Sequence, residues 1–145
     1  MAAYTDYLEN KLVDWLLRGQ TFTPPATTYI GLFTVAPTDS TAGTEASGGS
    51  YARVSVASSL TNWAGTQAAA STTASTGTSG TTSNNSAITF PAATADWGTV
   101  VAFGIFDAAS SGNLLIYAAL TANRTITTGA TASFAAGTLT VQVDN

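Results

Sequence analysis

The sequence contains no cysteine and no histidine. Without cysteine the chain has no disulfide, no thiolate nucleophile and no Cys-based metal site. Without histidine it lacks the side chain most often used as a general base or metal ligand near neutral pH. Both absences argue against an enzyme, and we expect a protein without catalytic residues, bound metal or cofactor.

Charged side chains are scarce. The chain has four Lys or Arg and eight Asp or Glu, and charged residues make up 8% of it, against about 25% in a typical soluble domain. Four cations leave no basic stripe to neutralise phosphates, so we expect no nucleic-acid partner. Soluble monomers generally depend on mixed surface charge, so this composition predicts that neighbouring subunits cover much of the surface.

Long hydrophobic runs are also missing. The longest covers residues 100–106, well short of the ~20 residues of a membrane-spanning helix. The first turns carry Asp6, Glu9 and Asp14 where a signal peptide has basic and apolar regions. We therefore expect a soluble protein with no membrane partner. Its 145 residues fit one domain.

The start of the chain has helical periodicity, which predicts a helix over residues 5–18. Asp6 and Glu9 have the spacing of a capping box, and Gly19 is placed to end the helix. A helix this short needs a docking surface, either the protein's own sheet or a neighbouring subunit. The apolar side chains that recur at three- and four-residue steps are Tyr4, Leu8, Leu12, Trp15 and Leu16. Four of these are candidate subunit-interface residues: Leu8, Leu12, Trp15 and Leu16.

The rest of the chain reads as β-structure. Short runs rich in β-branched and aromatic residues, separated by Gly, Pro, Asn and Ser, are typical of an all-β sandwich or jelly roll. We thus predict a mainly β fold: an N-terminal helix within residues 1–20, then one antiparallel, jelly-roll-like β-sandwich domain over residues 21–145. The runs are residues 29–35, 51–63, 86–91, 99–106, 113–120, 124–127, 131–134 and 138–143.

Residues 64–83 are almost entirely Ala, Gly, Ser and Thr, with Gln67 as the exception. Such a segment has no large apolar group to offset the entropy of ordering it. Two interpretations remain open: a mobile loop, or an arm that becomes ordered on another subunit.

Asp107 lies between two apolar runs in "GIFDAASSGNLLIY". An aspartate at the end of a strand accepts hydrogen bonds from backbone N–H groups of a turn, and Gly112 with Asn113 tolerates positive φ before the next strand. A catalytic role would need a second carboxylate or a base as a partner, and nothing in the sequence indicates such a partner for Asp107. We interpret the segment as a hairpin loop.

Three weaker candidate sites remain. The oxygen-rich loop around Asp39 and Glu45, which includes Thr44 and Ser47, is a possible cation ligand set, although it lacks alternating aspartates. Trp63 and Trp97 are candidate glycan contacts by stacking on sugar rings. The two cations outside the helix, Arg53 and Arg124, are expected to pair with Asp107, Asp96 or a neighbouring subunit.

The chain resembles a family of small tailed-bacteriophage virion proteins often labelled "phage tail fibre protein". The resemblance covers roughly residues 4–145 and is carried by "SGGSYAR", "DWG" and "GIFDA" in this order, together with "YLENKLVDWLLRGQTFTPPATTYIGLFT" and "FAAGTLTVQV". It implies a structural component of the virion, assembled in the host cytoplasm, and brings no catalytic residues.

Two placements in the particle follow. Our leading expectation is a capsid cement or decoration protein whose partners are the major capsid protein, copies of itself, or both. The alternative is a tail or tail-fibre component with other tail proteins as partners, contacting host surface glycans through the tryptophans. A third class, a polysaccharide hydrolase, requires a carboxylate pair in a cleft.

Overall fold

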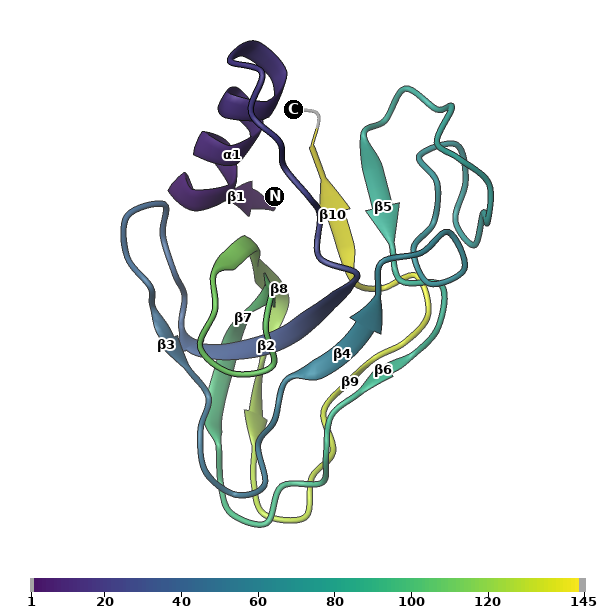
Figure 1. The fold of residues 1–145 in the computed structure, drawn as a ribbon. Helices are drawn as coiled ribbons and strands as arrows, with labels where there is room; N and C mark the ends of the chain where they lie inside the picture. Colours follow the sequence, from purple (N-terminus) through teal and green to yellow (C-terminus); the bar gives the residue numbers. More distant parts are fainter. Residues whose placement is uncertain (1, 144–145) are drawn as a thin grey trace.

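The computed structural model describes residues 2–143 and shows a mainly β fold with one N-terminal helix, which confirms the predicted fold class (Figure 1). Its main sheet is antiparallel, in the order β1-β8-β7-β2-β3, and β4 also pairs with β2. The strands of this sheet are β1 (Ala3–Tyr4), β2 (Thr27–Val35), β3 (Thr44–Glu45), β4 (Val54–Ala57), β7 (Gly98–Phe106) and β8 (Leu114–Ile126).

Two small antiparallel sheets accompany the main sheet. One pairs β5 (Thr81–Ser83) with β10 (Thr140–Gln142), and the other pairs β6 (Ile88–Thr89) with β9 (Ser133–Phe134). Figure 1 shows them beside the main sheet, with β4 between β2 and the β6–β9 pair. Side chains from all three sheets share one core, which makes the arrangement sandwich-like, while the jelly-roll topology stays a prediction.

Alternation along β2 explains how the main sheet buries both faces. Ile30 and Leu32 enter the main core, whereas Phe33 points to the other face, where it stacks on Phe106 at 5.9 Å between ring centroids. Side chains of a strand alternate between the two faces, so the central strands read as near-continuous apolar runs. The main core also takes side chains from the segments that carry the small sheets, among them Phe90, Trp97, Leu139 and Val141.

The helix α1 (Asp6–Leu17) is one residue shorter at each end than predicted. Its N-cap is Thr5, so the predicted Asp6–Glu9 capping box is wrong. The Thr5 hydroxyl makes no capping bond; it donates to the Leu114 carbonyl at 2.6 Å, which ties the start of α1 to β8. Gly19 follows the helix with φ of +67°, a conformation that favours glycine, as expected. Within residues 2–143 the one helix is too short to cross a bilayer.

Several strands differ from the sequence prediction. The predicted strand over residues 51–63 is reduced to β4, and the runs at 113–120 and 124–127 are one strand, β8. Tyr4 lies in β1, opposite Ile116, and not on the helix. The short strands β1, β3 and β5 have no counterpart in the prediction because two or three residues carry no periodic pattern.

Residues 64–80 form a loop that folds back on itself, and the two interpretations, a mobile loop and an arm that becomes ordered on another subunit, stay predictions. Gln67 is at its centre: its side-chain NH₂ donates to Ser71 Oγ at 2.7 Å, and its Oε1 accepts from the Thr76 N–H at 3.2 Å. The Thr66 hydroxyl accepts from the Gly77 N–H at 3.1 Å. Hydrogen bonds around one large polar side chain replace the missing apolar core of this segment.

Candidate functional site

The most buried ion pair of the described chain joins Arg53 and Glu45. Arg53 Nε donates to Glu45 Oε1 at 2.8 Å and Arg53 Nη2 to Oε2 at 2.7 Å, a bidentate geometry. The Tyr51 hydroxyl donates to the same Oε1 and accepts from the Leu32 N–H, both at 2.8 Å. Burial raises the pKa of Tyr51, so this phenol stays protonated.

Arg53 also holds the loop between β7 and β8. Its Nη1 donates to the carbonyls of Ala108 and Ser111, both at 2.8 Å, and its guanidinium lies 3.3 Å from the Phe106 ring centroid. The sequence suggested Asp107, Asp96 or a neighbouring subunit as the partner of Arg53, and the structure shows Glu45 of the same chain instead. With its donors used by the protein itself, Arg53 is a structural residue.

Asp107 stabilises the turn of the β7–β8 hairpin, as predicted. Its Oδ1 accepts from the Asn113 N–H at 2.7 Å and its Oδ2 from the Asn113 side-chain amide at 2.8 Å. Ser111 and Gly112 both have positive φ. A Cβ on Gly112 would lie 2.5 Å from Asp107 Oδ1, so this turn requires glycine.

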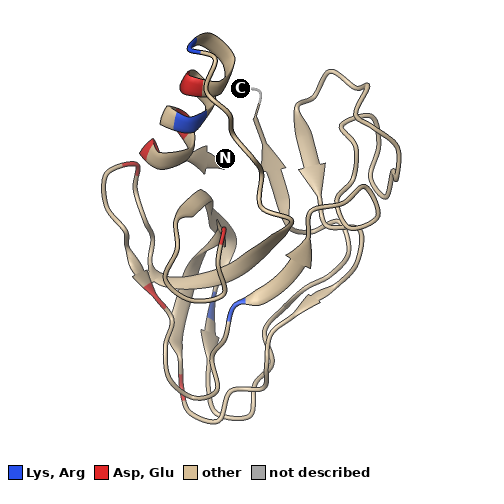
Figure 2. Cartoon of the chain, in the orientation of Figure 1, with Lys and Arg blue, Asp and Glu red and all other residues tan. Residues whose placement is uncertain are grey.

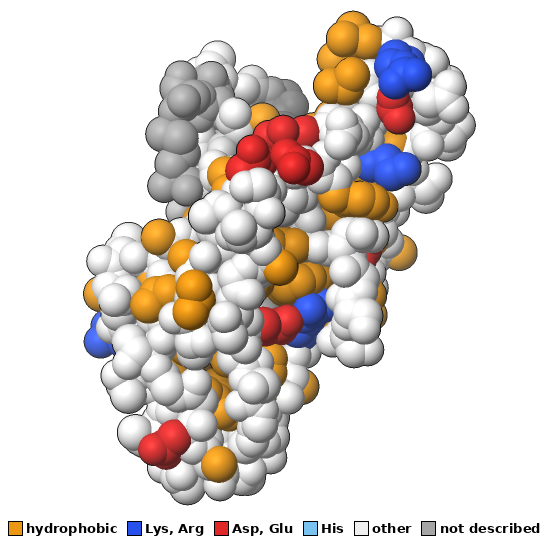
Figure 3. All heavy atoms as spheres, turned by 90° about the vertical axis from the view of Figure 1, so that its left-hand side faces the viewer, with side chains coloured by type: hydrophobic (Ala, Val, Ile, Leu, Met, Phe, Trp, Pro, Cys, Tyr) orange, Lys and Arg blue, Asp and Glu red, His pale blue; other side chains and the backbone are white. Residues whose placement is uncertain are grey.

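The acidic loop around Asp39 and Glu45 does not form the suggested cation site. Glu45 pairs with Arg53, while Asp39 lies with Asp6 and Glu9, their carboxylate oxygens within 4.8 Å of one another. All three side chains are exposed, and they form a red patch near α1 (Figure 3). The negative charge of Asp6 raises the pKa of Asp39.

Two further acids each bind one neighbouring residue. Asp96 Oδ1 accepts from the N–H and hydroxyl of Thr128, at 2.7 and 3.0 Å, and Asp14 pairs with Arg18 on the helix at 3.0 Å. Asp144 lies outside the described residues. Figure 2 shows charges on α1 and scattered over neighbouring loops, with little charge on the strands. The exposed patch of Asp6, Glu9 and Asp39 does not line the pocket described below.

The predicted interface face of α1 is divided between two environments. Leu8 is buried against the domain and Leu12 is half-buried, as docking on the protein's own sheet requires. Trp15 is 54% exposed and Leu16 71% exposed. Val13 and Leu17 are exposed as well, so the second half of α1 carries an apolar end that no described residue covers.

The two tryptophans proposed as glycan contacts lie in or against the core. Trp97 is 5% exposed and its indole N–H donates to the Gly49 carbonyl at 3.0 Å, so it offers no ring face to a sugar. It packs edge-on against Tyr51, with 5.2 Å between ring centroids. Trp63 is partly buried and packs on the same core, and a glycan contact there stays a prediction.

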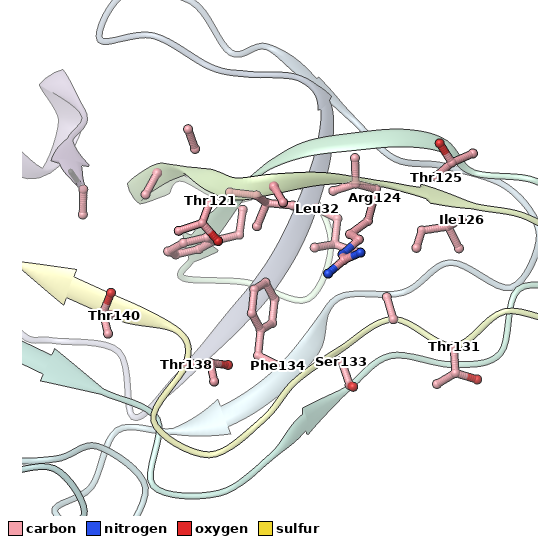
Figure 4. Close-up of a pocket in the computed structure, with 18 of the residues that line it drawn as sticks. Leu32, Thr121, Arg124, Thr125, Ile126, Thr131, Ser133, Phe134, Thr138 and Thr140 are labelled. Atoms are coloured by element: carbon pink, nitrogen blue, oxygen red, sulfur yellow. The ribbon is translucent and has the colours of Figure 1, made fainter.

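Sequence reasoning missed a pocket of about 640 Å³ between the main sheet and the two small sheets. Arg124, the second cation outside the helix, lines it together with Phe134 and several threonines (Figure 4). Neither Asp107 nor Asp96 pairs with Arg124, and no described carboxylate lies within ion-pair distance of it, while the third alternative, a neighbouring subunit, stays a prediction. The sole sequence signal was an arginine in a stretch otherwise free of charge, residues 108–143.

These features define a small β-sandwich-like domain whose buried polar groups hold loops in place. Across residues 3–142 the sequence matches the family described as "Podophage GP4 fiber I protein gp80". The chain therefore belongs to this family of phage fibre proteins, as the resemblance implied, and is a component of the virus particle. No curated protein matches the sequence.

Proposed function

We propose that the protein is a non-enzymatic structural component of a phage tail fibre. The family match over residues 3–142 carries this proposal, because the family is described as a fibre protein. It favours the tail-fibre alternative over the capsid cement or decoration protein that the composition first suggested.

Two structural observations support a role in assembly. Polar side chains of the domain bind to other parts of the same chain, for example Arg53 to Glu45 and Asp107 to Asn113. The distal half of α1 leaves Trp15, Leu16 and Leu17 exposed after Leu8 has docked. Fully burying one such leucine contributes about 1.5–3 kcal/mol, so this end of α1 is well suited to attach the domain to another chain.

The charges near α1 favour a different protein over a second copy as the partner. The chain has a net charge of −4, and its exposed acidic patch of Asp6, Glu9 and Asp39 lies at the start of the same helix. The net charge of −4 opposes close association of two copies, whereas a tail protein with an apolar groove flanked by Lys or Arg would complement the exposed leucines and the acidic patch.

Separated heads and tails of purified particles test this proposal. Quantitative mass spectrometry of the two fractions should find the protein with the tails, at a copy number far below that of the shell subunits. Recovery with the heads at a copy number similar to the shell protein would contradict the tail assignment and favour capsid decoration. Light scattering of the isolated chain should give a monomer, and a stable dimer would replace the foreign partner with a second copy.

A further inference from the structure

The pocket of about 640 Å³ lies where the main sheet faces the small sheets, and its volume is within the range of about 300–1,000 Å³ typical of ligand pockets. Val100, Phe103 and Ala118 of the main sheet line it on one side, and Phe134 of β9 and Thr140 of β10 on another. Figure 4 shows the Arg124 guanidinium and the Phe134 ring reaching into this space from different strands.

An irregularity in β8 supplies one wall of the pocket. Ala102 pairs with Ala119 and Val100 with Arg124, so a two-residue step on β7 faces a five-residue step on β8. The extra length of β8, including Thr121 and Ala122, lines the pocket. Bulges re-aim side chains and are frequent next to functional sites. Here the bulge lies directly before Arg124 in the chain.

The electrostatics of the pocket differ from those of the whole chain. The protein has a net charge of −4, yet among residues 2–143 Arg124 is the one charged residue that lines the pocket, and no Asp or Glu of that range does. Arg124 makes no ion pair or side-chain hydrogen bond within the described chain. Its planar guanidinium is therefore available to a carboxylate, phosphate or sulfate group, which it binds in bidentate fashion.

The remaining walls combine an aromatic face with free hydroxyl groups. Phe134 is partly buried and is held by Phe103 and Phe90, at 5.7 and 6.5 Å between ring centroids. Its neighbours in the pocket include hydroxyl side chains that make no hydrogen bond to the described residues: Thr121, Thr131, Ser133 and Thr140. A fixed ring surrounded by small donors and acceptors fits a ligand that has both an apolar face and many hydroxyls.

We propose that this pocket binds an acidic saccharide. The anionic group of the sugar pairs with Arg124, its ring packs on Phe134, and its hydroxyls bond to the threonine and serine side chains. This inference deepens the proposed function and rests on it for the source of the ligand, which a tail fibre would meet as an acidic polysaccharide on the host surface. Repetition along a particle raises the effective affinity of weak single sites.

Titration of the ¹⁵N-labelled full chain, followed by NMR, tests the pocket directly. The probes are galacturonic acid, glucuronic acid and N-acetylneuraminic acid, with galactose and glucose as neutral counterparts and inorganic phosphate as a bare anion. We expect the acidic sugars to shift the backbone amides of Thr121 and Ser133 and the side-chain Nε–H of Arg124. The neutral sugars and phosphate should bind more weakly, because each has only part of the recognised chemistry.

The variant Arg124→Gln removes the charge from an exposed side chain. It should weaken binding of the acidic sugars by about 10-fold or more and leave binding of the neutral sugars unchanged. The matched control Lys11→Gln removes one positive charge from exposed α1, outside the pocket, and should bind like the unaltered chain. Thermal unfolding of each variant checks that the fold is retained.

Three results would overturn the inference: no pocket shifts with any sugar at saturating concentration, equal affinity in Arg124→Gln, or phosphate binding as tight as that of the acidic sugars. The last result would make the pocket a simple anion site. A protein found outside the tail would contradict the proposed function while leaving a measured sugar affinity intact. Tail location without sugar binding would contradict this inference alone.

Discussion

Arg53 is the residue on which the loops of one end of the molecule depend. Its side chain is 7% exposed. Arg53 directly precedes β4, and it pairs with Glu45 of β3. It also donates to the carbonyls of Ala108 and Ser111 in the β7–β8 loop. Gly31 lies close to this ion pair, because a Cβ on it would be 2.8 Å from Glu45 Oε1. One arginine thus fixes three parts of the chain that are far apart in sequence, and composition alone did not identify its partner.

Replacing Arg53 should destabilise the protein strongly. Arg53→Ala leaves Glu45 and two carbonyls without their donor, and removing one member of a buried pair costs about 3–5 kcal/mol. Because the Glu45 side chain is 25% exposed, we expect about 2–3 kcal/mol here, measured by urea denaturation. Arg18→Ala, at an exposed helical pair, is the control and should cost ~0.5 kcal/mol or less. Equal losses in the two variants would contradict the structural role of Arg53.

The Asp6–Glu9–Asp39 patch makes a prediction about pH. The charge of Asp6 raises the pKa of Asp39 above 3.8, so the folded chain holds that proton more tightly than the unfolded chain does. Its stabilising contribution is therefore complete below the unfolded pKa and is lost as the pH rises through the folded pKa.

Asp39→Asn removes this repulsion. At neutral pH and low ionic strength the melting temperature of the variant should be slightly higher than that of the unaltered chain. The difference should vanish below pH 3.8 and in about 1 M salt, where the Debye length falls to about 3 Å. Differential scanning calorimetry across pH and salt measures it, and a variant that is less stable at neutral pH would show that Asp39 makes a favourable contact.

At the scale of elements, α1 is half docked. A hydrogen bond from Thr5 joins the start of the helix to β8, and Leu8 is buried. In the second half Leu16 and Leu17 are exposed. Figure 3 shows this end of the molecule projecting from the rest. The sequence predicted the helix and left two docking surfaces open. In the structure the first half of α1 docks on the protein's own domain. The second half would dock on the proposed fibre partner.

The double variant Leu16→Ser, Leu17→Ser tests this division. Both side chains are more than two-thirds exposed, so the free energy of unfolding of the isolated chain should change by about 0.5 kcal/mol or less. Affinity for the fibre partner should fall by about 100-fold or more because two leucines are no longer buried. The measurement is the copy number of the variant in assembled particles. Leu60→Ser, at another exposed apolar position, should assemble normally, and normal assembly of the double variant would contradict attachment through α1.

The elements differ in how far the sequence predicts them. The helix and the strands β2, β7 and β8 follow from periodicity and β-branched runs, because local pattern and burial agree there. The strands β1, β3 and β5 are two or three residues long and exist through pairing with distant segments. The loop around Gln67 depends on hydrogen bonds that no hydrophobic pattern records.

At the scale of the whole molecule, scarcity of charge has two consequences. It predicts that neighbouring subunits cover much of the surface, and it makes Arg124, which pairs with no carboxylate of residues 2–143, conspicuous. The pocket around Arg124 was nevertheless beyond sequence reasoning. Arg124 and Phe134 belong to strands of different sheets that are paired with distant segments, and the bulge in β8 before Arg124 has no signature in the sequence.

The central claim is that this domain belongs to the tail fibre and is held there by the distal half of α1. An electron cryo-microscopy map of the intact particle tests it most directly. We predict density for the domain in the fibre, with Leu16 and Leu17 buried against another chain and the Arg124 pocket open to solvent. Density for the domain on the capsid shell, or in the fibre with the end of α1 uncovered, would contradict the account.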